Sequence, residues 1–414
     1  MIKKFIVSLF LIFSAVTIAQ QASSSPYSFY GIGDVRFKGN VENRLMGGIS
    51  VFPDSIHVNI QNPASYSSLK MSVYTVGASF NSTRLNSFTA NEKAQRTTLD
   101  YLAVGIPLKK LGFGFGLIPY SAVGYRIKNK NTANTIRQYD GSGGLNKVFL
   151  GAGYKFNPNF SVGADIQYNF GKIETRNINK IQAAQFGTQE RNTSELSGLN
   201  VDVSAMYQRK INQKLDFFGS LIYTPQSNLN SKNARVISTV LYSEFYDPVD
   251  VDLMDEENTN TTLKLPSKMT VGVGLGQSKK WMVGTELTFQ QSSKFGNRSN
   301  SITNVTYKDA FKYSVGGYYI PNYTSFSNYL KKITYRGGFR YENTGMVINS
   351  ENIRDYAFTA GFGLPLGGAF SNLNLGVEYG RRGTAKASLV EENYTNVVLS
   401  LSLNDRWFIK RKYD

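Results

Sequence analysis

From residue 70 onward, apolar and polar residues alternate along the chain with a period of two, as in β-strands with one apolar and one polar face. In residues 159–171 the apolar set is Phe160, Val162, Ala164, Ile166, Tyr168 and Phe170. Residues 371–380 and 397–404 repeat the pattern. Such segments begin near residues 70, 97, 110, 145, 159, 195, 213, 266, 279, 309, 332, 355, 371 and 394. They predict about fourteen strands, each of roughly the ten residues that a tilted membrane strand needs.

The expected connections between these strands alternate in length. Tight connections fall at 109–110, 157–159, 212–214, 278–280 and 367–370, and long ones at 84–96, 127–144, 177–194, 224–264 and 291–308. This alternation is typical of a transmembrane barrel with short turns at one end and long loops at the other. A soluble β-sandwich or a propeller would also alternate, but neither requires alternating loop lengths, and no blade-length repeat is present. The sequence therefore predicts an all-β protein, a transmembrane antiparallel β-barrel over residues 69–414.

The first 68 residues lack this alternation. Residues 1–19 have a basic start at Lys3 and Lys4, a short apolar stretch and small residues near Ala19, which together predict a secretory signal peptide. Residues 20–68 precede the first strand, and we expect them to lie inside or beneath the barrel as an N-terminal plug, or hatch.

The composition narrows the classes of function and site. The chain has 414 residues, a formal net charge of +17 and no cysteine, so a lipid-modified cysteine, a disulfide and a thiolate metal site are excluded. Lysine and arginine are scattered through expected turns and loops. We therefore expect the basic charge to suit anionic lipid head groups, including lipopolysaccharide, and we expect no nucleic-acid partner. No cofactor motif is found, because GFGFG does not match a phosphate-binding fingerprint.

Several short motifs resemble those of the FadL-type outer-membrane transporters of long-chain fatty acids and other hydrophobic compounds. They are NPASYSSL before the first strand, LIYTPQSNL near the end of the seventh and LPSKMTVGVGL at the start of the eighth. SPYSFYGIGD (25–34), RLMGG (44–48) and the tail SLNDRWFIKRKYD resemble the FadL-like proteins of Bacteroidetes. The resemblance implies a fourteen-stranded barrel in a Gram-negative outer membrane, plugged by a hatch that carries Asn-Pro-Ala.

The resemblance also implies a ligand path formed by the hatch triplet and by a kink in the third strand. The hatch residues are Asn62, Pro63 and Ala64, and the gate residues are Gly116, Pro119 and Tyr120. Proline cannot donate a ladder hydrogen bond, so Pro119 should open the barrel wall, although a strand that ends at Leu117 before a loop is the alternative. In the triplet, Pro63 favours a sharp turn in which the Asn62 side chain satisfies a nearby backbone group. An ordinary turn into the first strand fits the triplet equally well.

Two further features invite a chemical interpretation. His57 is the only histidine, but no G-x-S-x-G elbow accompanies it, and a structural, hydrogen-bonded histidine is expected instead of a catalytic one. In residues 247–258, five carboxylates lie close together, those of Asp250, Asp252, Asp255, Glu256 and Glu257. The spacing fails the EF-hand pattern, with Met254 where a ligand oxygen belongs. A solvated loop is the expectation there, and we expect neither a metal site nor enzyme activity.

The inward face of the expected barrel carries charges of both signs. The residues in question are Asp165, Asp202, Glu286, Arg336, Arg340 and Glu378. Such charges can pair with each other and with a plug, or they can line a water channel. The FadL-like interpretation is uptake of hydrophobic or amphiphilic small molecules by lateral diffusion into the membrane. The alternative is a non-transporting assembly or secretion component that binds other outer-membrane proteins, similar to the PorV component of type IX secretion.

Overall fold

The computed structural model describes residues 23–35, 37, 39–88, 90–131, 134–181, 183–243, 247–295, 304–366 and 371–407. The expected signal peptide, residues 1–19, lies outside the described residues. No helix in the described ranges is long and apolar enough to span a membrane.

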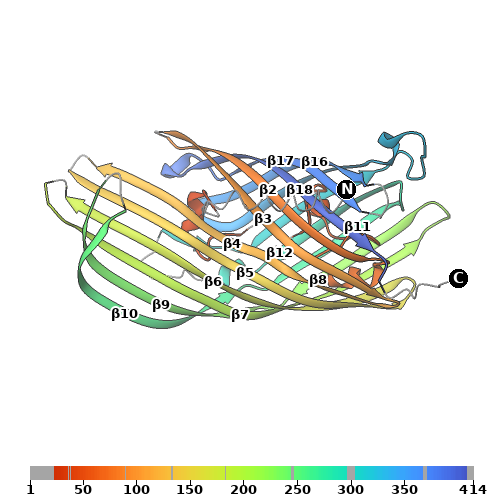
Figure 1. The fold of residues 1–414 in the computed structure, drawn as a ribbon, viewed down its shortest axis with the longest axis horizontal. Coiled ribbons are helices and arrows are strands. Elements are labelled where there is room, and N and C mark those ends of the chain that lie inside the picture. The colour runs from red at the N-terminus through yellow and green to blue at the C-terminus, as the bar shows by residue number, and fades with distance from the viewer. Residues whose placement is uncertain are drawn as a thin grey trace.

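Fourteen long strands form a closed antiparallel barrel (Figure 1). In barrel order they are β2 (Ser72–Asn86), β3 (Asn91–Leu108), β4 (Leu111–Asn131), β5 (Thr135–Asn157), β6 (Phe160–Ile181), β7 (Gly187–Lys210), β8 (Asp216–Thr224), β11 (Lys268–Gln277), β12 (Trp281–Gln290), β14 (Ala310–Tyr319), β15 (Thr334–Ile348), β16 (Glu351–Pro365), β17 (Asn372–Arg382) and β18 (Glu391–Asp405). Each strand pairs with the next, and β18 pairs with β2 to close the ring. The predicted fold class is confirmed.

The two faces of the barrel wall follow the alternation in the sequence. On β6, Ile166 is 60% exposed on the outer face, while Asp165 and Gln167 are buried on the inner face. On β17, Leu375 is exposed and Glu378 is fully buried. An outer band of aliphatic and aromatic side chains suits contact with hydrocarbon, and the polar inner face is that of a transmembrane barrel.

The connections depart from the sequence prediction in two ways. The segments 84–96, 127–144, 177–194 and 224–264 are mostly strand instead of loop. Strands β2 to β7 are longer than expected, and β9 (Ser227–Leu241) and β10 (Val249–Leu265) form a further hairpin. The second departure is residues 320–333, which make a long connection at the end where short turns were predicted. This connection contains the short helix η4 (Tyr329–Lys332). Alternating sequence continues into the extended hairpins, so the loop prediction failed where strands outgrow the barrel.

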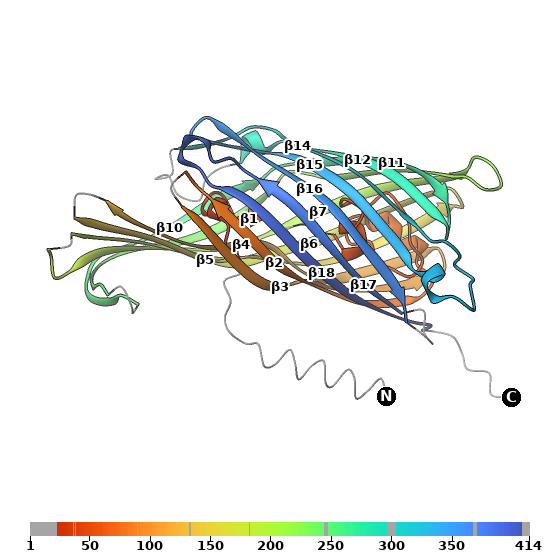
Figure 2. The same cartoon turned by 90° about the horizontal axis from the view of Figure 1, so that it is seen from above.

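The N-terminal segment, residues 23–71, lies within the ring of strands (Figure 2). Its elements are η1 (Pro26–Phe29), β1 (Asp34–Val35), α2 (Val41–Arg44) and η2 (Pro63–Ser68). The 3₁₀ helix η2 packs against the inner faces of β4, β5, β6 and β7, and α2 contacts β17 and β18. Three further short elements are β13 (Val305–Tyr307), η3 (Ser292–Lys294) and η5 (Lys386–Ser388).

Candidate functional site

The barrel wall is interrupted between β3 and β4. The two strands pair from Leu108 and Leu111 as far as Leu102 and Leu117, where their ladder ends. Beyond this point β3 continues to pair with β2, and β4 continues to pair with β5 up to Asn131. The described strands therefore part above Leu102 and Leu117, and each has an edge there that the other does not cover.

The N-terminal segment occupies part of this break. Its strand β1 pairs with β4, with Asp34 opposite Ala122 and Val35 opposite Ser121. The hydroxyl of Ser121 also donates a hydrogen bond of 2.7 Å to the carbonyl of Ile32. Strand β1 thus supplies a short substitute for the missing β3 partner.

Pro119 and Tyr120 lie at the break. The β4–β5 register shifts between Pro119 and Ser121, which leaves Tyr120 as the extra residue of a β-bulge. Because proline has no backbone N–H, it fits a strand edge that lacks a neighbour. The strand does not end at Leu117, which was the alternative that the sequence left open, since β4 runs on to Asn131.

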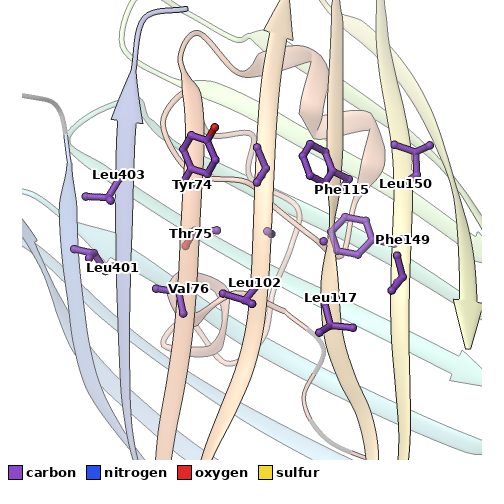
Figure 3. Close-up of a pocket in the computed structure, with 14 residues that line it drawn as sticks. Tyr74, Thr75, Val76, Leu102, Phe115, Leu117, Phe149, Leu150, Leu401 and Leu403 are labelled. Carbon is purple, nitrogen blue, oxygen red and sulfur yellow. The ribbon is translucent and has the colours of Figure 1, made fainter. Parts of the chain in front are cut away.

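An apolar groove follows the outer surface of the wall at the lower end of the break. Its volume is about 560 Å³, and its lining comes from β18, β2, β3, β4 and β5. Figure 3 shows Leu102 of β3 between Val76 of β2 and Leu117 of β4. Tyr74 of β2 and Phe115 of β4 line the groove further along the same strands. Since this surface lies on the outward apolar band, the groove opens toward hydrocarbon.

A second cavity, of about 310 Å³, lies inside the barrel between the wall and the N-terminal segment. Phe149 of β5 lines both this inner cavity and the outer groove. It is 2% exposed and lies opposite Gly116 in the β4–β5 ladder. A Cβ at Gly116 would come within 2.9 Å of the Phe149 ring and within 2.2 Å of the Leu102 carbonyl oxygen. The absence of a side chain at Gly116 therefore leaves the phenyl ring of Phe149 as the partition between the two spaces.

The inner cavity is lined by lysines as well as apolar side chains. Lys147 places its Nζ 4.4 Å from the centre of the Tyr120 ring and hydrogen-bonds Gln167. Lys268 and Lys312 also line the cavity, and neither has a carboxylate within 4 Å among the described residues. One wall of the same cavity is formed by apolar residues that include Ile118 and Phe149. Carboxylates line the cavity as well, those of Asp202, Glu286, Glu342 and Asp355. The cavity therefore combines charges of both signs with apolar surface.

The Asn-Pro-Ala triplet lies against the wall on the inner side. Pro63 begins η2, and the N–H of Ala64 donates to Ser204 of β7 at 2.8 Å. The close approach depends on glycines in the wall, since a Cβ at Gly163 would come within 2.4 Å of the Pro63 backbone. Asn62 is fully buried, but its side-chain amide has no hydrogen-bond partner among the described residues. The prediction that the Asn62 side chain bonds a nearby backbone group is therefore wrong. The backbone carbonyl oxygen of Asn62 accepts hydrogen bonds from Ser65 instead.

The predicted lumenal charges form separate groups. Glu378 pairs with Arg44 of α2 at 2.6 Å and with Arg340 at 2.8 Å. Arg340 also lies 3.5 Å from Asp355, whose carboxylate accepts from the Tyr394 hydroxyl at 2.6 Å. These contacts tie the N-terminal segment to β15, β16, β17 and β18.

The remaining lumenal charges lie elsewhere on the inner wall. Asp165 and Asp202 both accept from the side-chain amide of Gln167, each at 2.6 Å. Glu286 accepts from the backbone N–H of Ser50 at 2.7 Å, so it too holds the N-terminal segment. Arg336 donates to the Asn374 side chain at 2.8 Å.

His57 is buried between two carboxylates of its own segment. Its Nδ1 lies 2.8 Å from Asp54, and its Nε2 lies 3.7 Å from Glu42. Burial lowers the pKa of His57, but the charge of Asp54 and their hydrogen bond outweigh it and raise the pKa overall. Burial raises the pKa of Asp54, but His57 and the Ile56 N–H lower it to about 2.

The acidic stretch 247–258 is mostly strand, not the expected loop. Val249 to Asn258 belong to β10. Within the described ranges, no group of His, Asp and Glu is arranged to hold a metal ion.

Sequence reasoning did not find several residues of this site. Arg44 and Asp34 lie in a segment without periodicity, and their partners are hundreds of residues away, as with Arg382, which donates to Asp34 at 2.5 Å. Phe149 was visible only as one inward position among many. Its role depends on the length of the β3–β4 ladder, which no local pattern encodes.

The closed antiparallel barrel is a fold also seen in two solved structures. The chain is similar to a Pseudomonas aeruginosa FadL homologue, with 12% identity and a TM-score of 0.60, over 91% of this chain and 99% of that chain. It is similar to the Pseudomonas putida toluene transporter TodX, with 13% identity and a TM-score of 0.60, over 91% and 100%. At this identity the likeness concerns the fold. The chain matches the BamG family over residues 1–414 and belongs to that family. No curated protein sequence matches it.

Proposed function

We propose that this protein is an outer-membrane barrel of a Gram-negative cell that passes hydrophobic or amphiphilic small molecules sideways from its lumen into the bilayer. The observation that carries the proposal is the position of Phe149, whose ring lines both the inner cavity and the outer apolar groove. Movement of this one side chain at the break in the β3–β4 ladder would join the two spaces. A ligand on this route avoids exposing its apolar surface to water, which would cost roughly 25 cal/mol of free energy per Å².

The lining of the inner cavity favours an amphiphile. Ile118 and Phe149 offer apolar contact for its tail. Lys268 and Lys312 have no carboxylate within 4 Å in the described chain, although Asp202, Glu286, Glu342 and Asp355 line the same cavity. A carboxylate or phosphate head could pair with the lysines while the apolar tail points to the break. Asn62, Pro63 and Ala64 would serve as the support of the plug on the opposite wall instead of as ligand contacts.

A reversible tether across the break tests the transport proposal. Val35 and Ser121 are register partners, so Val35→Cys/Ser121→Cys should form a disulfide that fixes β1 on β4. The native chain has no cysteine, so the pair is unique. Oxidised cells should lose uptake of a fluorescent long-chain fatty acid, and reduction should restore it. The control Asn86→Cys/Asn91→Cys tethers the β2–β3 hairpin, and its uptake should not change with oxidation. Equal uptake by the oxidised and reduced Val35/Ser121 protein would refute the lateral route.

The second candidate is a non-transporting assembly or secretion component. It is favoured by the polar contacts of Arg44, Ser50 and Asp34, which hold the N-terminal segment to the wall on several sides. Native mass spectrometry of gently solubilised protein separates the two functions. A bound amphiphile supports transport, whereas an empty lumen with stoichiometric outer-membrane partners supports assembly.

A further inference from the structure

On one side of the barrel, the strands extend well beyond the ends of the strands on the other side. Strands β4, β5, β6 and β7 extend past the barrel as hairpins, and β9 pairs with the upper part of β7, from Gly187 opposite Val240 to Ser197 opposite Asn230. Strand β10 completes this raised sheet by pairing with β9. Figure 1 shows these hairpins projecting at the left, beyond the ends of the other strands.

Strand β10 is the terminal strand of this raised sheet and is exposed on both faces. Every residue from Val249 to Thr262 is exposed, and only Leu263 and Leu265 at its base are buried. Among the described residues β10 pairs with β9 alone. Its other edge therefore presents a row of backbone N–H and C=O groups that no described strand covers.

The edge is regular over most of its length. Two register shifts, between Asp250 and Asp252 and between Leu253 and Asp255, interrupt its first part. From Asp255 to Leu265 the ladder with β9 is uninterrupted. Bulges protect a strand edge from pairing, so the part of β10 before Asp255 is a poor partner for another strand. The regular part from Asp255 to Leu265 can pair with one.

The charge of the edge determines which strand it can accept. Asp255, Glu256 and Glu257 are consecutive and exposed, in a chain whose net charge is +17. An antiparallel pair of two β10 strands centred on this region would bring carboxylates opposite carboxylates, which is destabilising. The edge therefore disfavours a second copy of this chain and favours a basic strand.

We propose that the open edge of β10 from Asp255 to Thr262 binds an extended strand of a partner protein with basic side chains opposite Asp255, Glu256 and Glu257. Binding adds a strand to the raised sheet, so the backbone supplies hydrogen bonds and the carboxylates supply selectivity. This surface lies outside the lumen and is independent of the transport route.

A basic peptide tests the edge directly. The full-length protein in detergent micelles is mixed with a synthetic peptide of about ten alternating Lys and Thr residues, the span of the uninterrupted ladder. The Lys/Thr peptide should bind and should protect β10 amides from hydrogen exchange, while a Glu/Thr peptide should not bind. Glu256→Lys/Glu257→Lys should weaken binding roughly tenfold. The matched variant Glu92→Lys/Asp405→Lys makes the same charge change at exposed acids elsewhere and should bind as the native protein does.

Two single proline variants, at adjacent positions of β10, distinguish the contribution of backbone hydrogen bonds to peptide binding from that of the carboxylates. Neighbouring residues of a strand direct their N–H groups to opposite edges, so one of Asn258→Pro and Thr259→Pro removes only a donor of the open edge. That variant should keep the β9–β10 hairpin but lose the peptide-induced protection. The proposal is overturned if the Lys/Thr peptide leaves β10 unprotected, if the two charge variants bind equally, or if the native protein self-associates through β10.

Discussion

The guanidinium of Arg44, in the short helix α2, lies 2.6 Å from the carboxylate of Glu378 on β17. The Glu378 side chain is fully buried, and Arg340 approaches it at 2.8 Å from the other side. A buried carboxylate between two arginines is stable only while both partners stay in place. The N-terminal segment and the barrel wall are therefore held as one unit at this point.

Replacement of Arg44 by methionine should loosen the N-terminal segment. The loss leaves Asp100 without its 3.2 Å partner and Glu378 with one arginine instead of two. Breaking a buried ion pair typically costs about 3 to 5 kcal/mol. Arg44→Met should unfold at a lower temperature in detergent, and limited proteolysis should cut within residues 23–71. Arg381→Met, which removes an exposed ion pair with Glu391, is the control and should leave both measurements nearly unchanged.

Truncation of Phe149 should open the partition between the inner cavity and the outer groove. Phe149→Ala removes the only side chain that lines both spaces among the described residues. Uptake of a small apolar fluorophore should rise several-fold in cells. Phe218→Ala removes an equally buried ring that packs on Phe52 away from the break, with a comparable loss of stability of about 3 to 5 kcal/mol. Equal uptake by the two variants would show that any loss of packing, and not this partition, controls passage.

Replacement of Pro119 should close the break. Pro119→Val restores a backbone donor two residues beyond the end of the β3–β4 ladder and favours extended pairing with β3. Uptake of a hydrophobic probe should fall several-fold while the barrel stays folded and heat-stable. Pro107→Val, inside the paired part of β3, is the control and should not alter uptake. A folded Pro119→Val protein with native uptake would argue against lateral passage at this position.

Features of the fold that depend on residues close together in the sequence were predictable, and those that depend on residues far apart in the sequence were not. The strand pattern is local, because each outward position must suit hydrocarbon, so fourteen strands were predictable with starts such as 110, observed at Leu111. The acidic stretch 247–258 was expected to be a loop because its charges suit water. Its backbone pairs with β9, however, and an edge strand can be polar on both faces.

The site was less predictable than the fold. Gly116, Pro119 and Tyr120 do meet at the break in the described wall, since a proline restricts pairing locally. The pairing of Arg44 with Glu378 spans 334 positions and leaves no periodic signal. The Asn62 side chain was expected to cap a turn, but the tight packing of η2 on the wall placed it where no described group bonds to it.

The last prediction concerns pH and the contact between His57 and Asp54. The pKa of His57 is raised above 6.5. Its contribution to the stability of the folded state is therefore complete below pH 6.5 and is lost as pH rises through the folded-state pKa. The pKa of Asp54 is lowered from 3.8 to about 2, so its contribution is present above pH 3.8 and is lost as pH falls toward 2. The pair should therefore anchor its loop best between about pH 4 and 6.5.

The protection factors of amides 54–60, which compare the observed hydrogen exchange with the intrinsic rate at the same pH, should be highest in that window in detergent and should fall on the alkaline side. Glu42 and Arg336 also act on His57, with opposite effects on its pKa, so the variants must leave both in place. His57→Gln keeps a side chain of similar reach but cannot become charged, and its protection factors should no longer change between pH 5 and 8. Asp54→Asn removes the charge that favours protonated His57 and should shift the alkaline limit to lower pH. A loss of protection at alkaline pH that survives in His57→Gln would assign the pH response to a group other than a histidine, since His57 is the only histidine in the chain.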